Sequence, residues 1–323
     1  MQIDNLLLPT DFSDCADHAL TQAIDLAERF GATLHILHVV NEMDPDWYGL
    51  TTSQDEAGAL REAIEDTALQ RLHEIAPDEA HRDFETVISL QLSFDVAGTI
   101  NEYVDERAVD LIVMGTHGRQ GLERLMLGNV ADKLIRHAPC PVLTVNEETP
   151  WISRQEDTSV TDVLAPVDFS DHSKQALVAA KTFAHVHDAT LHLLFVAERR
   201  VVPTFSDTGI PGVNVVEMDP KIVNNAEEAL QQLHATTPGP EVAAEVHVRD
   251  GQVAGNVVDF AEGRGVGLIV MATRGLTGVN RFLLGSNTER IVRVAPCPVL
   301  TVQTDEAETG DDLVEPAAAE DGA

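Results

Sequence analysis

Two glycine-rich stretches of this 323-residue chain could do chemistry, MGTHGRQGLERLMLGN at 114–129 and MATRGLTGVNRFLLGS at 271–286. Each follows a dense run of β-branched residues and leads into a helical pattern. Glycines such as Gly115 and Gly118 can take backbone angles closed to other residues and let a ligand approach the main chain, and the free N–H groups at a helix start favour an anion. The spacing therefore indicates either a phosphate-binding loop or a tight strand-to-helix connection without a ligand.

Three better-known phosphate and nucleophile motifs are absent from the sequence. There is no GxxxxGK[ST] of a P-loop, no GxGxxG after a strand and no GxSxG elbow. The glycine-rich stretches must therefore be interpreted from their own setting in the fold.

The chain contains an internal sequence duplication. LLLPTDFSD at 6–14 matches VLAPVDFSD at 163–171, and APCPVLTV at 138–145 recurs unchanged at 295–302, both offset by 157 residues. The glycine-rich stretches and the segments ATLHILHVV and ATLHLLFVA keep the same offset. We predict two equivalent domains at 1–146 and 160–304, joined by a linker at 147–159. An acidic, disordered tail is predicted at 305–323.

Each copy alternates strand and helix patterns. In copy one, apolar runs predict strands at 3–9, 33–40, 86–92, 111–114 and 142–145. Helical spacing predicts helices at 14–30, 53–75, 97–108 and 130–137, and copy two repeats the order. This alternation indicates an α/β fold, two tandem Rossmann-like parallel sheets of about five strands with helices on both faces. The glycine-rich stretch would lie at the carboxyl ends of the strands, where such sheets bind ligands.

Three motifs resemble the universal stress protein family, in order and in both copies. They are an Asp closing the first strand, Gly-x2-Gly-x9-Gly-Ser/Thr after the fourth, and the terminal APCPVLTV strand. The resemblance implies strand order 3-2-1-4-5 in each domain and pairing of the two copies through their last strands. It also implies that ATP, with Mg²⁺, is bound at the glycine loop, as in many members of the family.

The resemblance implies roles for particular residues. Asp11 and Asp168 would contact the nucleoside, and Val39 and Val196 would meet adenine through their backbone. The phosphates would be held by Gly115, Gly118, Gly128 and Asn129 in copy one and by Ala272, Gly275, Gly285 and Ser286 in copy two.

Both copies depart from the family pattern. Asn129 stands where the family has Ser or Thr, and Ala272 replaces the first glycine. Asn caps helices about as well as Ser, whereas an alanine matters only if that position needs a positive φ or close contact with the ligand. Arg274 replaces His117 and could add a charge-assisted phosphate contact.

Three functions compete on this evidence. The first is a nucleotide-binding stress module acting as a switch or protective factor, and the second is a stress scaffold whose loops are structural, which the departures favour. An adenylate-forming or ATP-cleaving enzyme would need an SGGxDS loop, but the first strand ends in PTDFSD. Because no placed base, Walker-type lysine or arginine finger is found, we expect no catalysis beyond slow ATP hydrolysis.

Composition limits partners and compartment. With 21 basic and 54 acidic residues the net charge is −33, which excludes an ordinary nucleic-acid binder and disfavours anionic membranes. An acidic chain with so few lysines suits a salt-rich cytoplasm, where charge repulsion is screened. The three cysteines form no CxxC and fit a reducing compartment, Cys140 and Cys297 as small buried hydrophobes. No stretch approaches 18 apolar residues, so we expect a cytoplasmic protein without membrane association.

The thirteen histidines suggest metal binding only superficially. His35 and His38 would face opposite sides of one strand, which excludes chelation by that pair, and we expect no metal site. His185 and His187 end a helix, where a positive imidazolium would suit the dipole. Ser13 or Asp14 is expected to cap the helix at 14–30, and Asp14 and Asp171 are expected to be helix N-caps rather than catalytic acids.

Overall fold

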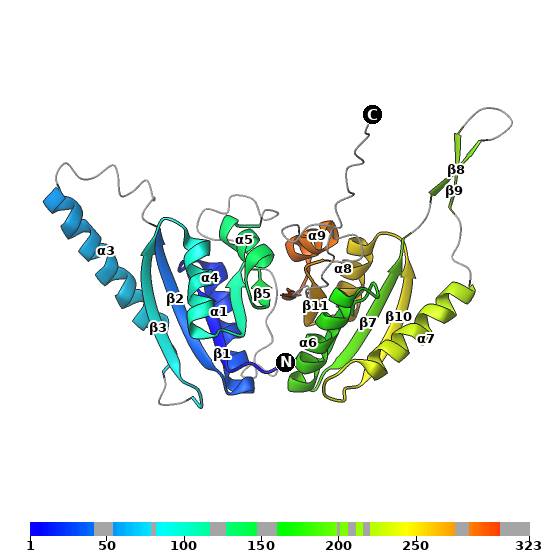
Figure 1. The fold of residues 1–323 in the computed structure, drawn as a ribbon, viewed down its shortest axis with the longest axis horizontal. Helices are drawn as coiled ribbons and strands as arrows, with labels where there is room; N and C mark the ends of the chain where they lie inside the picture. The colour runs from blue at the N-terminus through cyan, green and yellow to red at the C-terminus, as the bar shows by residue number, and fades with distance from the viewer. Residues whose placement is uncertain are drawn as a thin grey trace, which may run out of the picture.

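The structure is a computed structural model that describes residues 1–41, 54–78, 82–116, 127–146, 160–198, 201–205, 211–215, 220–274 and 284–303 (Figure 1). The predicted linker, all of the predicted tail, and Gly118 and Gly275 lie outside these ranges. Among the described helices none is long and apolar enough to cross a membrane.

Strand and helix alternate through the first copy as predicted. Its elements are β1 (Asn5–Pro9), α1 (Asp14–Phe30), β2 (Thr33–Asn41), α3 (Gln54–Ile75), β3 (Thr86–Ser93), α4 (Val96–Arg107), β4 (Leu111–Gly115), α5 (Asn129–His137) and β5 (Val142–Val145). Each predicted boundary lies within two residues of the observed one.

The second copy repeats this order and adds one hairpin. Its elements are β6 (Asp162–Pro166), α6 (Asp171–His187), β7 (Thr190–Ala197), β8 (Val201–Phe205), β9 (Pro211–Val215), α7 (Pro220–Thr236), β10 (Ala244–Asp250), α8 (Val253–Arg264), β11 (Leu268–Ala272), α9 (Ser286–Val294) and β12 (Val299–Val302). The antiparallel pair β8–β9 was not predicted. Pro203 and Gly212 interrupt these two short strands, and both residues weaken a strand pattern.

All the other strands form one ten-stranded sheet in the order β10-β7-β6-β11-β12-β5-β4-β1-β2-β3. Each half has the expected order, third-second-first-fourth-fifth, with parallel neighbours. The halves join where β12 pairs antiparallel with β5, Leu300 opposite Leu143. Thr144 Oγ1 donates to Val299 O and Thr301 Oγ1 to Val142 O, both at 3.1 Å. The predicted pairing of the two copies through their last strands is therefore present within one chain.

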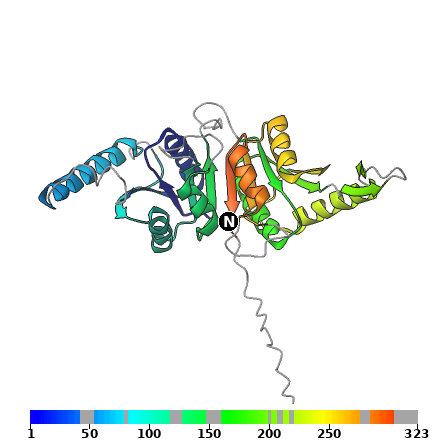
Figure 2. The same ribbon diagram turned by 90° about the horizontal axis from the view of Figure 1, so that it is seen from above.

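Two hydrophobic clusters cover the opposite faces of this shared sheet. One includes side chains of α1 and α6, and the other includes side chains of α4, α5, α8 and α9. Helices α1 and α6 also meet across the junction of the domains. Their Phe30 and Phe183 rings lie 5.6 Å apart, and Arg29 Nη1 donates to Val186 O at 3.4 Å. Helices α3 and α7 lie at the two outer ends of the molecule (Figures 1 and 2).

Serine rather than aspartate caps the first helix of each domain. Ser13 Oγ accepts from Ala16 N at 3.3 Å, and Ser170 Oγ accepts from Ser173 N at 3.1 Å. Of the two residues predicted as the cap of α1, Ser13 is therefore confirmed and Asp14 is not the cap, and the prediction that Asp171 caps α6 is wrong. Both are the first residues of their helices, where a carboxylate still complements the dipole.

Candidate nucleotide site

The first strand of each domain is shorter than its neighbour at the carboxyl edge. Strand β1 pairs with β2 only as far as Pro9 opposite Leu37, and Thr10 N adds one more bond to Leu37 O at 2.9 Å. Strand β2 continues to Asn41 against β3. Because β1 lies between β2 and β4, this is the topological switch point of the sheet, the place where open α/β sheets bind ligands. Domain 2 repeats the arrangement, with Val167 N bonded to Leu194 O at 2.9 Å.

Asp11 and Asp168 lie directly after these short strands and shape the turn that follows. Asp11 Oδ1 accepts from Ser13 N at 3.1 Å. Asp168 Oδ1 accepts from Ser170 N at 3.0 Å and from Ser170 Oγ at 2.6 Å. Both aspartates are half-buried at the predicted place, and they also organise the start of the next helix.

A phenylalanine in the left-handed region follows each aspartate. Phe12 has φ 60° and Phe169 has φ 64°, conformations that a bulky side chain rarely adopts. Side-chain packing offsets the strain. The Phe12 ring lies 4.5 Å from that of His38 with the Arg71 guanidinium 4.3 Å from its centre, and Phe169 lies 5.2 Å from Phe195. Strain retained at the same place in both domains is typical of a functional turn.

Val39 and Val196 lie near the ends of β2 and β7. Their side chains are buried in the cluster that faces α4 and α8, so a ligand at this edge could reach only their backbone. This placement agrees with the role that the resemblance implies for them.

The first residue of each glycine loop is set by packing. Gly115 ends β4 without a positive φ, so the expectation of unusual backbone angles is wrong here. A Cβ at Gly115 would lie 2.8 Å from Cys15 Sγ and 3.1 Å from the Cys15 carbonyl carbon, which is too close. In domain 2 the residue at the position of Cys15 is His172, and Ala272 fits at the end of β11. The methyl group that Cys15 excludes at Gly115 is thus accommodated at Ala272, where no cysteine stands at the equivalent position of the helix.

The last glycine of each loop caps the following helix. Gly128 and Gly285 have φ −62° and −60°, and their N–H groups donate to Thr116 O and Thr273 O at 2.8 and 2.9 Å. Asn129 is thus the first helical residue of α5, as Ser286 is of α9, and neither is the cap. No side-chain cap hydrogen bond forms at either start within the described part of the chain. Such a helix start can offer its backbone N–H groups to an anion.

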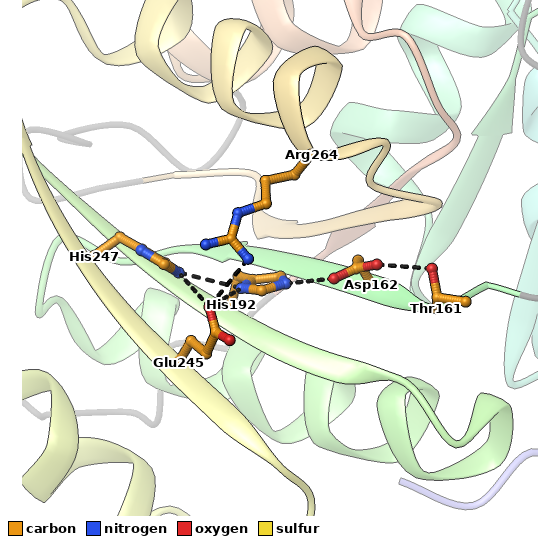
Figure 3. A network of polar contacts seen from close by, with 6 residues as sticks. All are labelled: Thr161, Asp162, His192, Glu245, His247 and Arg264. Carbon is orange, nitrogen blue, oxygen red and sulfur yellow. Dashed lines mark hydrogen bonds and ion pairs between the residues drawn. The ribbon is translucent and has the colours of Figure 1, made fainter.

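A second polar cluster, not predicted from the sequence, lies nearer the amino end of β7 (Figure 3). His192 is fully buried, with Nε2 2.7 Å from Asp162 Oδ1 and Nδ1 3.1 Å from His247 Nε2. Glu245 Oε2 lies 3.6 Å from both of the facing ring nitrogens, and Arg264 Nη1 lies 3.1 Å from the same oxygen. We call His192, Glu245 and His247 the β7–β10 triad.

Domain 1 has a neutral network at the corresponding place. His35 Nδ1 lies 3.0 Å from Tyr103 Oη, and His35 Nε2 lies 3.4 Å from Asn5 Oδ1. Burial, with help from Arg107, lowers the pKa of His35, and burial raises the pKa of Tyr103. His38 points elsewhere, its Nδ1 2.7 Å from Thr10 O, so the predicted separation of the two histidines is confirmed.

Two other predictions about titratable residues have opposite outcomes. Burial raises the pKa of the Cys140 and Cys297 thiols to about 12, which confirms them as inert, buried side chains. Burial, with the nearby Arg29 guanidinium, lowers the pKa of His187 to about 3. His187 is therefore neutral, and its predicted role as a positive charge at the end of α6 is wrong.

The comparison with known families agrees with this geometry. The model of the universal stress protein family matches residues 2–146 and again residues 160–303. The chain belongs to the universal stress protein family. Both of its domains are members, in tandem, as the sequence motifs predicted.

Individual relatives match one domain or both. Universal stress protein MJ0531 of Methanocaldococcus jannaschii is 33% identical over 144 residues, 44% of this chain and 81% of that protein. Universal stress protein YxiE of Bacillus subtilis is 32% identical over 144 residues, 44% of this chain and 97% of that protein. The crystal structure of a universal stress protein from Archaeoglobus fulgidus aligns with TM-score 0.65 and 19% identity over 94% of this chain and 99% of its own. The fold likeness thus extends over both domains.

Proposed function

We propose that this tandem universal stress protein binds an adenine nucleotide, ATP with Mg²⁺, at the carboxyl edge of one or both half-sheets. The observation that carries the proposal is the same in each domain. At the carboxyl edge of the sheet the first strand stops short of its neighbour, and the helix that follows the fourth strand starts without a side-chain cap. A nucleoside would lie at the end of the first strand, and its phosphates would lie at the helix start.

Domain 2 is the stronger candidate. It keeps the serine that the family pattern has at the helix start, Ser286, and Arg274 lies beside that start. The Arg274 Cα is 4.0 Å from the position that a Cβ on Gly285 would take. The alanine at the first loop position has a packing explanation, so Ala272 is no argument against a ligand.

We expect the protein to act by binding and not by catalysis. No general base, Walker-type lysine or arginine finger was found for phosphoryl transfer, so any hydrolysis would be slow. Nucleotide binding would change a surface that other proteins of the stress response bind. We expect this to take place in the cytoplasm. We also propose that two whole chains can associate further as a homodimer.

The alternative is a scaffold without a nucleotide. The contact of Gly115 with Cys15 favours it, because that glycine is needed for packing whether or not a ligand binds. The two functions differ in a single measurable property, the presence of nucleotide binding.

The test places a negative charge where the phosphates would lie. Asn129→Asp and Ser286→Asp should retain the fold, because a carboxylate in the first turn suits the helix dipole. Each should weaken ATP–Mg²⁺ binding at least tenfold in its own domain, measured calorimetrically in molar KCl after bound small molecules have been removed and identified by mass spectrometry.

Matched controls complete the test. Asn129→Ser restores the family residue and should keep or tighten binding, and Arg274→Gln should weaken binding in domain 2. We expect the wild-type affinity to hold or rise with KCl, because salt screens repulsion between phosphates and the net charge of −33. Absence of released nucleotide and of binding heat in the wild type would favour the scaffold.

A further inference from the structure

The β7–β10 triad brings three strong metal-ligating atoms together. Its ligand atoms, His192 Nδ1, His247 Nε2 and Glu245 Oε2, are separated by 3.1, 3.6 and 3.6 Å. Zinc takes histidine nitrogens and carboxylate oxygens at about 2.0–2.2 Å in a tetrahedron, which places neighbouring ligand atoms about 3.3–3.6 Å apart. The triad therefore has the dimensions of three corners of a zinc tetrahedron with only small adjustments.

We propose that His192, Glu245 and His247 bind one divalent transition-metal ion of the zinc type in domain 2. Two histidines and one carboxylate form a known zinc ligand set and leave the fourth position for water. The Glu245 side chain is half-exposed at 50%, whereas that of His192 is fully buried. The buried histidine would hold the ion in place, and the fourth coordination position would face solvent.

Asp162 orients the buried ligand. Its Oδ1 accepts from His192 Nε2 at 2.7 Å, so the other ring nitrogen, Nδ1, faces the other two ligands (Figure 3). A carboxylate behind a histidine is the usual outer partner of a metal-bound imidazole, because it fixes both tautomer and ring orientation. Thr161 Oγ1 in turn donates to Asp162 Oδ2 at 2.7 Å.

Arg264 completes the cluster when no metal is bound. Its guanidinium lies on Glu245 Oε2, the same oxygen that would ligate the ion. The Arg264 side chain is 44% exposed and can leave toward solvent. His247 Nε2 and His192 Nδ1 share a hydrogen bond at 3.1 Å, and both atoms must offer a lone pair to an ion, so the proton between them would leave or move to His247 Nδ1. Metal binding thus replaces an internal ion pair and a hydrogen bond.

Domain 1 provides a matched internal control. The residues paired with β2 at the positions of Glu245 and His247 are Val87 and Ser89, and Tyr103 satisfies His35 in place of a second ring. This set of three ligands therefore has no counterpart at the corresponding described positions of domain 1. They join the edge strand β10 to β7, so the ion would strengthen that side of the sheet.

The experiment uses the full chain, freed of metal by chelation and dialysis. ZnCl₂ added alone should bind with one high-affinity site per chain and raise Tm, and Co²⁺ should give the visible absorption bands of a tetrahedral site with nitrogen and oxygen ligands. His247→Ser and Glu245→Val, which introduce the residues of domain 1, should weaken Zn²⁺ binding at least 100-fold and abolish the Co²⁺ bands. Ser89→Ala in domain 1 should change neither.

Arg264→Gln gives a second, independent readout. Removing the competing guanidinium should tighten Zn²⁺ binding severalfold without touching a ligand, whereas a structural arginine would give no such gain. Circular dichroism establishes that each variant is folded. Equal Zn²⁺ binding by wild type and His247→Ser, or no Zn²⁺-dependent change in Tm and no Co²⁺ bands in the wild type, would overturn the proposal.

Discussion

The two domains have one backbone plan but different interiors, and the differences occur in compensating sets. Gly115 with Cys15 in domain 1 becomes Ala272 with His172 in domain 2. Tyr103, which satisfies His35, becomes Phe260, and His192 turns instead to His247. Each changed residue is matched by a changed neighbour, which is how close-packed interiors tolerate substitution. The comparison teaches that equivalent positions cannot be interpreted one residue at a time.

The largest expected effect tests the glycine at the end of β4. Gly115→Ala should lower the free energy of unfolding by about 3 kcal/mol, because the added methyl group collides with Cys15. Ala272→Gly should cost only about 1 kcal/mol, the usual penalty for glycine in a strand. Urea unfolding of the two variants measures both.

A double variant sharpens this result. Cys15→Ala should recover part of the loss in Gly115→Ala, because it removes the closest atom, Sγ at 2.8 Å, but not the backbone contact. Equal costs for Gly115→Ala and Ala272→Gly would show that packing does not distinguish the two loops.

The next effect concerns two equivalent positions, Phe30 in domain 1 and His187 in domain 2. Burial holds the pKa of His187 at about 3 in the folded chain, below the ordinary value of 6.5. Below pH 6.5 the unfolded chain binds a proton at this histidine, and the folded chain does not. The contribution of His187 to the free energy of unfolding therefore has its full value above pH 6.5 and falls as the pH decreases. From pH 7 to pH 5 the loss is about 2 kcal/mol.

His187→Phe, which introduces the residue of domain 1, should remove that part of the pH dependence. The measurement is urea unfolding of wild type and variant at pH 7 and pH 5. The other histidines are the same in both proteins, so the difference between the two slopes isolates His187. Parallel slopes would mean that His187 accepts its proton in the folded state.

The smallest effect concerns α1 and α6. Gln22 is fully buried, and neither amide atom has a hydrogen-bond partner among the described residues, whereas its counterpart is Ala179. Gln22→Met keeps the shape and removes the amide, so it should raise the free energy of unfolding by about 1 kcal/mol. Thermal unfolding measures this change, with the exposed Gln70→Met as a control that should change Tm little. A loss of stability on Gln22→Met would imply that the amide is satisfied.

Much of the fold could be predicted from local patterns. Helix α1 has the predicted bounds because apolar spacing, Ser13 and Gly31 all act within the same segment. The strand order came from the family resemblance and is the one observed. The hairpin β8–β9 escaped prediction because its short strands are interrupted and it has no counterpart in the predicted elements of copy one.

The candidate site could be predicted less completely, because its geometry depends on contacts between distant segments. Gly115 was assigned to a ligand, and only the approach of α1 shows that Cys15 also requires it. The β7–β10 triad joins residues of strands far apart in sequence. The alternation in Glu245-Val246-His247 puts two ligating side chains on one face, but the register that places Glu245 opposite His192 is known only from the sheet.

The antiparallel contact between β5 and β12 has an evolutionary consequence. In a symmetric homodimer every substitution appears in both subunits, so the two sites must change together. Here the partners are covalently linked, at an effective concentration of the order of millimolar, and each covers the strand edge that the other would expose. Gene duplication followed by fusion therefore lets one half acquire new ligands while the other retains the ancestral interior, without loss of the assembly.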